Sequence, residues 1–334
     1  MKRVCLKDIA NRVGVSTALV SYVLNNKKEG RIGKDISIKI REAARQMGYR
    51  ANQIARSLKT NKTFTIGLIV ADISNPFSSS LARIIEDAAG KFQYTVLFGS
   101  SDENPDKFSR LIDAFLNRQV DGLIISPPDG TGEQICYLSE QRIPFVLLDR
   151  YFPEQSSNYI ALDNQKASFN AVHHMLDRGC RRIGLITYKS DLHHLGQRKK
   201  GYEDALRQYD IEPRQEWIRE LCINHRQEEV VEAIEQLLAL PEPTDGLLFA
   251  SNTLSATGLR HLNRLSIRVP DDLAVVSYDE TDSLDLFYAP LTYIRQPLQE
   301  MGKRSVDILL AAMERDQPPT QLLLDAELVV RSST

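Results

Sequence analysis

Apolar residues near the start of the chain recur with the spacing of a helix face. The first such face consists of Leu6, Ile9, Ala10 and Val13. It is followed by Gly14, a residue that favours a helix C-terminus. Ser16 has the character of an N-cap, and a second short helix is expected from Thr17 to Asn25, with its inward face formed by Val20, Val23 and Leu24. Two short helices joined by a tight, glycine-containing turn form a helix-turn-helix.

A third amphipathic segment follows, and it ends at Gly48. Its apolar residues are Ile36, Ile40, Ala43, Ala44 and Met47. We expect this helix to cover the apolar faces of the first two. A three-helix unit of this size has only a small core, but it can present one helix to the major groove of DNA.

Beyond Lys62 the pattern changes to near-continuous apolar runs separated by helical stretches. The first run, Phe64 to Ile73, is typical of a strand buried in a parallel sheet. Further strands are expected at Thr95–Ser100, Gly122–Ser126, Phe145–Asp149, Ile160–Asp163, Ile183–Tyr188, Gly246–Ser251 and Ala274–Asp279. This alternation predicts a doubly wound α/β architecture, and roughly 270 residues are enough for two lobes.

Charge divides the chain at the same place. Residues 1–62 hold 15 Lys and Arg against 4 Asp and Glu, a net charge of +11. The whole chain holds 42 basic and 44 acidic residues, so the remainder holds 27 and 40, a net charge of −13. A basic segment joined to an acidic one points to a polyanion partner for the basic segment, and nucleic acid fits the helix-turn-helix pattern.

The first two helices carry a specific motif. Residues 4–25, which read VCLKDIANRVGVSTALVSYVLN, resemble the DNA-binding headpiece of the lactose/galactose repressor (LacI/GalR) family, with the pattern L-x-D-x-A-x-x-x-G-V-S-x-x-x-V-S-x-x-L-N intact. The resemblance implies base contacts from Thr17, Ala18 and Tyr22. It also implies further DNA contacts from Leu6, Ser16, Ser21 and Asn25. The three polar residues among these are expected to contact phosphates.

Residues 49–58, which read YRANQIARSL, resemble the hinge segment of that family. In the family a short helix from each of two protomers enters the minor groove and opens it with a leucine. The resemblance implies that Asn52 caps this helix, that Ala55 is among its DNA contacts and that Leu58 is the wedge. A plain interdomain linker, with Leu58 packed on the larger domain, is the alternative.

The acidic part resembles the type I periplasmic-binding-protein fold, so the resemblance to the repressor family extends over essentially the whole chain. We expect a helix-turn-helix domain at 1–50, a hinge helix and linker at 51–62, and a two-lobed effector-binding and dimerisation domain at 63–334. Lobe 1 is expected to comprise about 63–161 and 292–322, and lobe 2 about 162–291 and 323–334. Thr292 to Gln296 is expected to be one of the crossovers between the lobes.

Ligands of open α/β sheets bind beyond the carboxyl ends of the strands, which selects the polar residues that follow each strand. The candidates for effector contacts are Asp72, Ser74, Asn75, Phe77, Asp149, Asn252 and Asp279. The family resemblance adds Arg198 and supports Asn252 and Asp279. The alternative role for each is a turn cap or a hydrogen bond between the lobes.

Patterns for other chemistry are weak. The sequence has no nucleotide-binding, nucleophile-elbow or metalloprotease motif, and the loop of residues 127–132, PPDGTG, is made of ordinary turn formers. The four cysteines form no C-x-x-C pair and are expected to be reduced and buried. The pairs His173–His174 and His193–His194 are interpreted as surface or helix-face residues, and Trp217 as a core residue. No metal or cofactor is expected.

The predicted function is sequence-specific, homodimeric DNA binding in transcription regulation, as a repressor of palindromic operators that responds to a sugar or sugar derivative. No enzymatic activity is expected. The chain has neither a signal peptide nor a run of 18 apolar residues, so a cytoplasmic location is expected. A two-lobed solute-binding protein is the alternative, and a secretion signal would be its mark.

Overall fold

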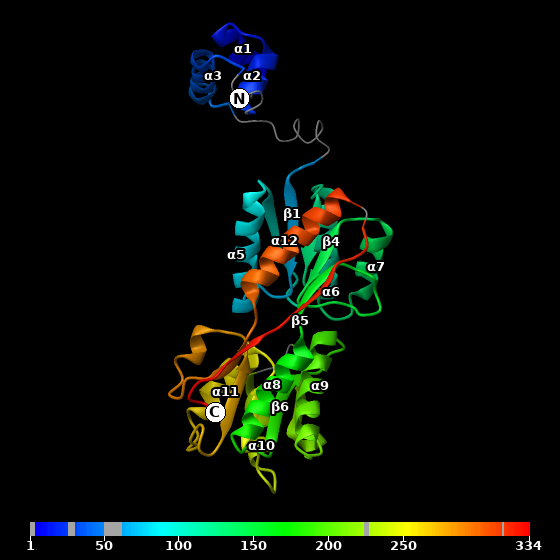
Figure 1. Cartoon of the computed structure of the whole chain (residues 1–334), viewed down its shortest axis with the longest axis vertical. Helices are drawn as coiled ribbons and strands as arrows, with labels where there is room; N and C mark the ends of the chain where they lie inside the picture. The colour runs from blue at the N-terminus through cyan, green and yellow to red at the C-terminus, as the bar shows by residue number, and fades with distance from the viewer. Residues whose placement is uncertain (1–3, 26–30, 50–61, 224–226, 316) are drawn as a thin grey trace. The chain divides into compact units, whose positions relative to one another are not determined.

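The computed structural model describes residues 4–25, 31–49, 62–223, 227–315 and 317–334 (Figure 1). The chain divides into two compact units, Met1–Thr63 and Phe64–Thr334. The predicted hinge contacts Asn52, Ala55 and Leu58 lie outside the described residues.

The first unit contains the three predicted helices, α1 (Leu6–Val13), α2 (Thr17–Leu24) and α3 (Lys34–Gln46). Gly14 closes α1 with a left-handed backbone (φ 77°), a conformation that glycine adopts at little cost. The Ser16 hydroxyl caps α2 by accepting the Leu19 N–H at 3.2 Å. Ile9, Val20 and Ile40, one from each helix, are fully buried against one another in a small core.

The second unit contains two six-stranded sheets, each the centre of one lobe. The sheet of lobe 1 is entirely parallel, in the order β11-β5-β4-β3-β1-β2. Its strands are β1 (Thr65–Val70), β2 (Thr95–Ser100), β3 (Gly122–Ile125), β4 (Phe145–Leu148), β5 (Tyr159–Leu162) and β11 (Gln321–Leu324). The near-continuous apolar sequences of the central strands β1, β3 and β4 are explained by burial on both faces.

Helices cover both faces of this sheet. One face packs against α5 (Pro76–Lys91) and α12 (Leu298–Glu314), which lie side by side although they are far apart in the sequence (Figure 1). The other face packs against α6 (Pro105–Asn117) and α7 (Gly132–Glu140). Lobe 1 is therefore a three-layer α/β/α unit.

Lobe 2 repeats this plan with the sheet order β12-β10-β9-β8-β6-β7. Its strands are β6 (Ile183–Tyr188), β7 (Ile218–Leu221), β8 (Gly246–Phe249), β9 (Ala274–Tyr278), β10 (Thr292–Arg295) and β12 (Glu327–Val329), of which β12 is antiparallel to β10. The helices α8 (Asn164–Asp177) and α9 (His193–Gln208) pack on one face, and α10 (Gln227–Leu238) and α11 (Asn252–Leu262) on the other. Trp217 is a buried core residue, as predicted.

The crossovers between the lobes differ in detail from the sequence prediction. Residues 292–295 were expected in lobe 1, but they form β10, which pairs with β9 in lobe 2. The chain crosses only after Gln296. The return to lobe 2 also comes later than 322, because β11 pairs with β5 as far as Leu324. Strand pairing, which the apolar pattern does not specify, decides both boundaries.

The expectation of buried thiols was wrong for three of the four cysteines. Cys180 is buried, whereas Cys5, Cys136 and Cys222 are exposed, and none forms a disulfide. Cys136 lies on the outward face of α7, and Cys5 precedes the first turn of α1. No helix among the described residues is long and apolar enough to span a membrane.

Candidate functional site

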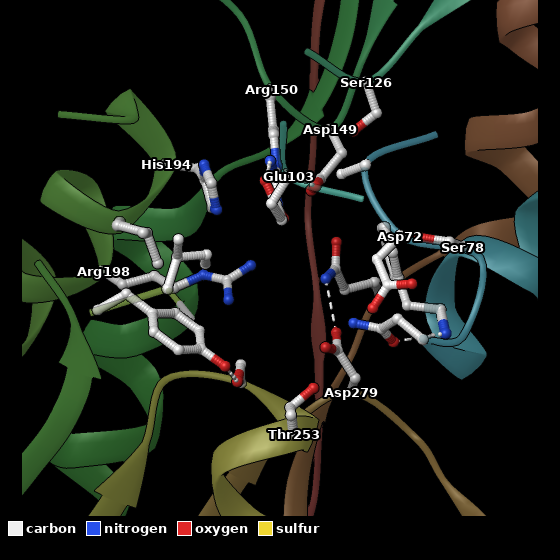
Figure 2. Close-up of a pocket in the computed structure, with 18 residues that line it drawn as sticks. Asp72, Ser78, Glu103, Ser126, Asp149, Arg150, His194, Arg198, Thr253 and Asp279 are labelled. Atoms are coloured by element: carbon white, nitrogen blue, oxygen red, sulfur yellow. Dashed lines mark hydrogen bonds and ion pairs between the residues drawn. The ribbon is translucent and has the colours of Figure 1, made fainter. Parts of the chain in front are cut away.

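A cavity lies between the two lobes, at the carboxyl ends of both sheets (Figure 2). Lobe 1 contributes Ala71, Asp72, Asn75, Phe77, Ser78, Glu103, Ser126, Asp149 and Arg150. Lobe 2 and the crossover contribute Tyr188, His194, Leu195, Arg198, Ile223, Ser251, Thr253, Asp279 and Gln296. This is the position where the topology of open α/β sheets places a ligand site.

Two aspartates occupy equivalent positions in the two lobes. Asp149 follows β4 and Asp279 follows β9, and both have left-handed backbones, with φ values of 68° and 69°. Asp and Asn tolerate this conformation better than most residues. The N–H of Asp149 donates to Ile160 O of the neighbouring strand at 2.8 Å, and that of Asp279 donates to Ile294 O at 3.0 Å. Each strand end therefore directs a carboxylate toward the cavity.

The two carboxylates differ in their partners. Asp279 Oδ1 accepts from Gln296 Nε2 at 2.6 Å. Asp149 Oδ1 is buried and has no hydrogen-bond partner in the described structure, and Asp149 Oδ2 lies 3.9 Å from Arg150 Nε. Burial raises the pKa of Asp149 to about 6, against the lowering effect of Arg150 and Arg198, and Asp279 raises it further. Burial likewise raises the pKa of Asp279.

Arg150 and Glu103 neutralise each other at one wall of the cavity. The guanidinium donates two hydrogen bonds to the carboxylate, at 2.8 and 2.6 Å, in the bidentate geometry that favours such pairs. Arg150 Nη1 also donates to the carbonyl of Pro127 at 3.2 Å. Both Nη atoms of Arg150 are therefore occupied within the protein, and the pair adds little net charge to the cavity.

Arg198 is held rigidly from α9, with 4% of its surface exposed. Its Nε donates to Asn164 Oδ1 at 2.7 Å and its Nη1 to Ala250 O at 2.6 Å, while the guanidinium stacks on the Tyr278 ring at 3.9 Å. Figure 2 shows the end of the guanidinium directed into the cavity. Two of its nitrogens are thus fixed by the protein, and Nη2 remains available for a ligand.

His194 is buried on the first turn of α9 and also faces the cavity (Figure 2). Burial lowers its pKa well below the ordinary value, and the positive charges of Arg198 and Arg150 lower it further. The imidazole is therefore neutral at physiological pH. Its Nδ1 has no hydrogen-bond partner in the described part of the chain.

The structure brings six of the eight candidate effector residues to the cavity wall: Asp72, Asn75, Phe77, Asp149, Arg198 and Asp279. The other two do not line it. Ser74 is exposed and donates its hydroxyl to Asp72 at 2.7 Å. Asn252 is buried and donates from Nδ2 to Asn75 Oδ1 at 2.8 Å, which is the hydrogen bond between lobes that the sequence left as the alternative.

Several cavity residues were absent from the candidate set. Glu103, Ser126 and Tyr188 lie at or just beyond strand ends, so applying the strand-end rule to every strand would have found them. Gln296 directly follows β10, so the same rule would have found it as well. His194 gave no such signal, because helix packing brings it to the cavity. No cluster of metal-ligating residues occurs in the described ranges.

The proposed DNA-contacting face of α2 is open to solvent or partly so. Thr17 and Ala18 are exposed, while Ser21 and Tyr22 are half-buried. Asn25 Nδ2 donates to Ser21 O at 2.8 Å, which closes the C-terminal end of the helix. The buried residues Val20 and Val23 hold α2 against α1 and α3.

A basic helix-turn-helix unit joined to a two-lobed domain with a polar cleft is the organisation of a ligand-responsive DNA-binding regulator. Residues 5–52 match the model of the bacterial regulatory proteins of the lacI family, and residues 172–334 match a periplasmic binding protein-like domain. The chain belongs to the LacI family, and it is a DNA-binding transcriptional regulator. The solute-binding alternative is contradicted by the match to residues 5–52.

Relatives resemble the chain along its whole length. It is 31% identical over 335 residues to the HTH-type transcriptional repressor CytR of Escherichia coli, covering 98% of this chain and 96% of the relative. It is 29% identical to the catabolite control protein A of Priestia megaterium over 99% of both chains. The fold also matches that of the Lac repressor dimer bound to operator and the anti-inducer ONPF, with a TM-score of 0.87, 23% identity and 99% of both chains covered.

Proposed function

We propose that the cleft binds a small, neutral, polyhydroxylated effector, a sugar or sugar derivative, and that its binding changes the affinity of the protein for operator DNA. The observation that carries this proposal is the set of buried, unpaired polar atoms in the cavity wall. Asp149 Oδ1 and Gln296 Oε1 are acceptors without partners among the described residues, and Arg150 Nε is a donor without one. Buried polar atoms are normally paired, so a ligand that pairs them gains affinity.

Hydroxyl groups suit this wall because each can donate and accept at once. A ring carrying several hydroxyls can donate to the carboxylates of Asp149 and Asp279 while accepting from the free nitrogen of Arg198. Phe77 and Leu195 offer apolar surface for the C–H face of such a ring. The relatives include a protein named ribose operon repressor, from Halalkalibacterium halodurans, which supports the same ligand class.

The charge of the cavity disfavours anions. Its acidic residues outnumber its basic ones, with Asp72, Glu103, Asp149 and Asp279 against Arg150 and Arg198. Since Glu103 pairs with Arg150 and the pKa of His194 is low, a phosphate group would meet more negative than positive charge. We therefore expect neutral sugars to bind and their phosphate esters to bind weakly or not at all.

A thermal-shift screen of the full-length protein tests the ligand class. Neutral sugars, sugar alcohols and nucleosides are compared with the corresponding phosphate esters. A ligand present at 100 times its Kd stabilises the protein by about 2.7 kcal/mol, which is easily detected. A shift with a neutral compound and not with its phosphate supports the proposal, and shifts with phosphate esters alone contradict it.

For the DNA side, we propose that the helix-turn-helix domain at 1–50 reads bases through Thr17, Ala18 and Tyr22. Leu6, Ser16, Ser21 and Asn25 supply the remaining contacts of this domain, and the hinge within 51–62 contributes Asn52, Ala55 and the wedge Leu58. A homodimer would present two copies of α2 to the two half-sites of a palindrome. This function places the protein in the cytoplasm, with its operator DNA.

Selection of duplexes from a random pool by the full-length protein tests this assignment. Enrichment of a palindrome is expected, with an affinity that falls steeply as salt rises because phosphate contacts release counterions. Tyr22→Ala should change the preferred base at one position of each half-site, by about 1–3 kcal/mol of discrimination. An enriched site that Tyr22→Ala binds with unchanged preference would remove Tyr22 from the base contacts.

A further inference from the structure

The loop of residues 127–132, between β3 and α7 of lobe 1, reaches across to lobe 2. Asp129 Oδ2 accepts the Ser190 hydroxyl at 2.6 Å and the Asp191 N–H at 3.1 Å. Ser190 Oγ in turn accepts the Leu192 N–H at 3.1 Å, and Leu192 is the N-cap of α9. One carboxylate of lobe 1 thus lies beside the backbone that begins α9 in lobe 2.

The loop is fixed on its own lobe. Asp129 Oδ1 accepts the N–H of Gly130 at 2.8 Å, and Gly130 has a left-handed backbone with φ 72°. The fully buried Thr131 donates to Pro128 O at 2.7 Å, and Arg150 donates to Pro127 O. Asp129 therefore does not swing freely but presents its carboxylate from a rigid turn.

The helix that Asp129 contacts carries the lobe 2 side of the cavity. His194 and Leu195 lie on the first turn of α9, and Arg198 one turn further on. Negative charge at a helix N-terminus is favourable because of the helix dipole and the unpaired N–H groups there. A second contact at the same place is the Tyr151 ring of lobe 1, 5.0 Å from the ring of His193.

We propose that Asp129 is a positioning residue for the effector cleft. Through Ser190 and Asp191 it fixes the start of α9 against lobe 1, and so sets where Arg198 and His194 stand relative to Asp149. It works together with the Asn75–Asn252 hydrogen bond, which also joins the two lobes near the cavity. The effect on effector affinity rests on the function proposed above, whereas the effect on the lobes does not.

The distance between the lobes tests this proposal without any ligand. One spin label is attached to the exposed Cys136 on α7 and one to α9 through Lys200→Cys, in a Cys5→Ser, Cys222→Ser background. Labelled chain is diluted with excess unlabelled chain, so that pulsed dipolar spectroscopy reports distances within one chain. Asp129→Asn preserves the size of the side chain but replaces a carboxylate oxygen with an amide that can donate.

The expected result is a longer and broader distance distribution in both variants, larger in Asp129→Asn than in Ser190→Ala, because Ser190→Ala keeps the hydrogen bond from the Asp191 N–H. The double variant should show no further change beyond Asp129→Asn, since Ser190 acts through Asp129. Asp102→Asn is the matched control, since Asp102 pairs with Lys107 within lobe 1 and should leave the distribution unchanged. Thermal midpoints close to that of the wild type would exclude general destabilisation.

Effector affinity supplies the second readout. For the neutral sugar with the largest thermal shift in the screen above, the Kd should rise about tenfold in Asp129→Asn, as expected for loss of one favourable contact across the cleft. An unchanged distance distribution in Asp129→Asn overturns the positioning role, whether or not a sugar binds. If the distribution changes but no sugar in the screen binds, the role of Asp129 between the lobes stands and the proposed ligand class is wrong.

Discussion

At the scale of single residues, the cleft depends on charged groups that the protein only partly satisfies. Asp149 is buried, and one of its oxygens has no partner in the described structure, while Arg198 has two of its nitrogens fixed by the protein. A buried carboxylate oxygen without a donor costs stability, and this cost is recovered when a ligand hydroxyl supplies the donor. The ligand-free protein is therefore less stable than it would be with this oxygen paired, and its affinity for the ligand is higher for the same reason.

Effector binding should depend on pH through Asp149. Burial raises its pKa to about 6, and a ligand hydroxyl hydrogen-bonds to the ionised form, so protonation competes with binding. Affinity should therefore be constant above about pH 7 and fall as the pH drops through 6. The charged groups that face Asp149 are Arg150, Arg198, Asp279 and Glu103. Titration calorimetry at pH 5 to 8 with the neutral sugar selected by the screen measures this dependence.

Asp149→Asn provides the matched variant, because Asn also tolerates the left-handed backbone at this position. The pKa of Asp149 is higher in the folded protein than in the unfolded chain. Ionisation of Asp149 therefore lowers the free energy of unfolding of the wild type progressively as the pH rises from about 4 through 6. Without ligand, Asp149→Asn should therefore be more stable than the wild type at pH 7.5, by at most about 3 kcal/mol, and no more stable than the wild type at pH 4. Equal stability at pH 7.5 would show that burying the ionised carboxylate of Asp149 does not cost stability.

At the scale of elements, α9 is the element on which the lobe 2 half of the site depends. It packs so closely on α8 that Gly201 leaves no room for a side chain, and a Cβ there would overlap the carbonyl oxygen of Gln165. This contact is backbone against backbone, so it can be relieved only by moving the helix. The position of Arg198 is set by this packing as well as by its own hydrogen bonds.

Gly201→Ala should therefore destabilise the protein by about 1–3 kcal/mol and weaken effector binding. Gly196→Ala on the same helix meets nothing within 4 Å and should be neutral or slightly stabilising, since alanine favours helix over glycine. Chemical denaturation of both variants measures the difference. A Gly201→Ala protein as stable as Gly196→Ala would contradict the close approach of the two helices.

The hinge is the second element with a testable role, and its residues are assigned from the family resemblance. Leu58→Ala should weaken operator binding, because a minor-groove wedge supplies contacts that compensate for unstacking a base step. Effector affinity should be unchanged, since the cavity is built entirely within Phe64–Thr334. Equal operator affinity of the variant and wild type in a gel-shift titration would favour the plain linker.

At the scale of the whole molecule, the sequence predicted the architecture well and the site in part. The switch from helical spacing to apolar runs at Lys62 predicted both kinds of unit, and Gly14 and Ser16 predicted the ends of α1 and α2. Asp149 and Asp279 followed from the strand-end rule. That rule could not predict that Asn252 bonds to Asn75, or that helix packing buries His194 at the cavity, because both depend on how two lobes meet.

The same limit explains the misplaced crossovers. The sequence predicts a crossover at 292–296, but residues 292–295 form a strand whose place in lobe 2 is set by pairing with β9. The local apolar pattern does not specify this pairing. Likewise, Asp129 lies in a loop with ordinary turn residues, and only the arrangement of the lobes gives its carboxylate partners at Ser190 and Asp191.

The central claim is that occupancy of the cleft controls DNA binding. Fluorescence anisotropy of the selected palindromic duplex, titrated with the full-length protein with and without the neutral sugar found by thermal shift, tests it most directly. The sugar should change the operator Kd of the wild type by about tenfold or more and leave that of Arg198→Ala within about twofold. An operator Kd of the wild type that stays the same at saturating sugar would contradict the claim.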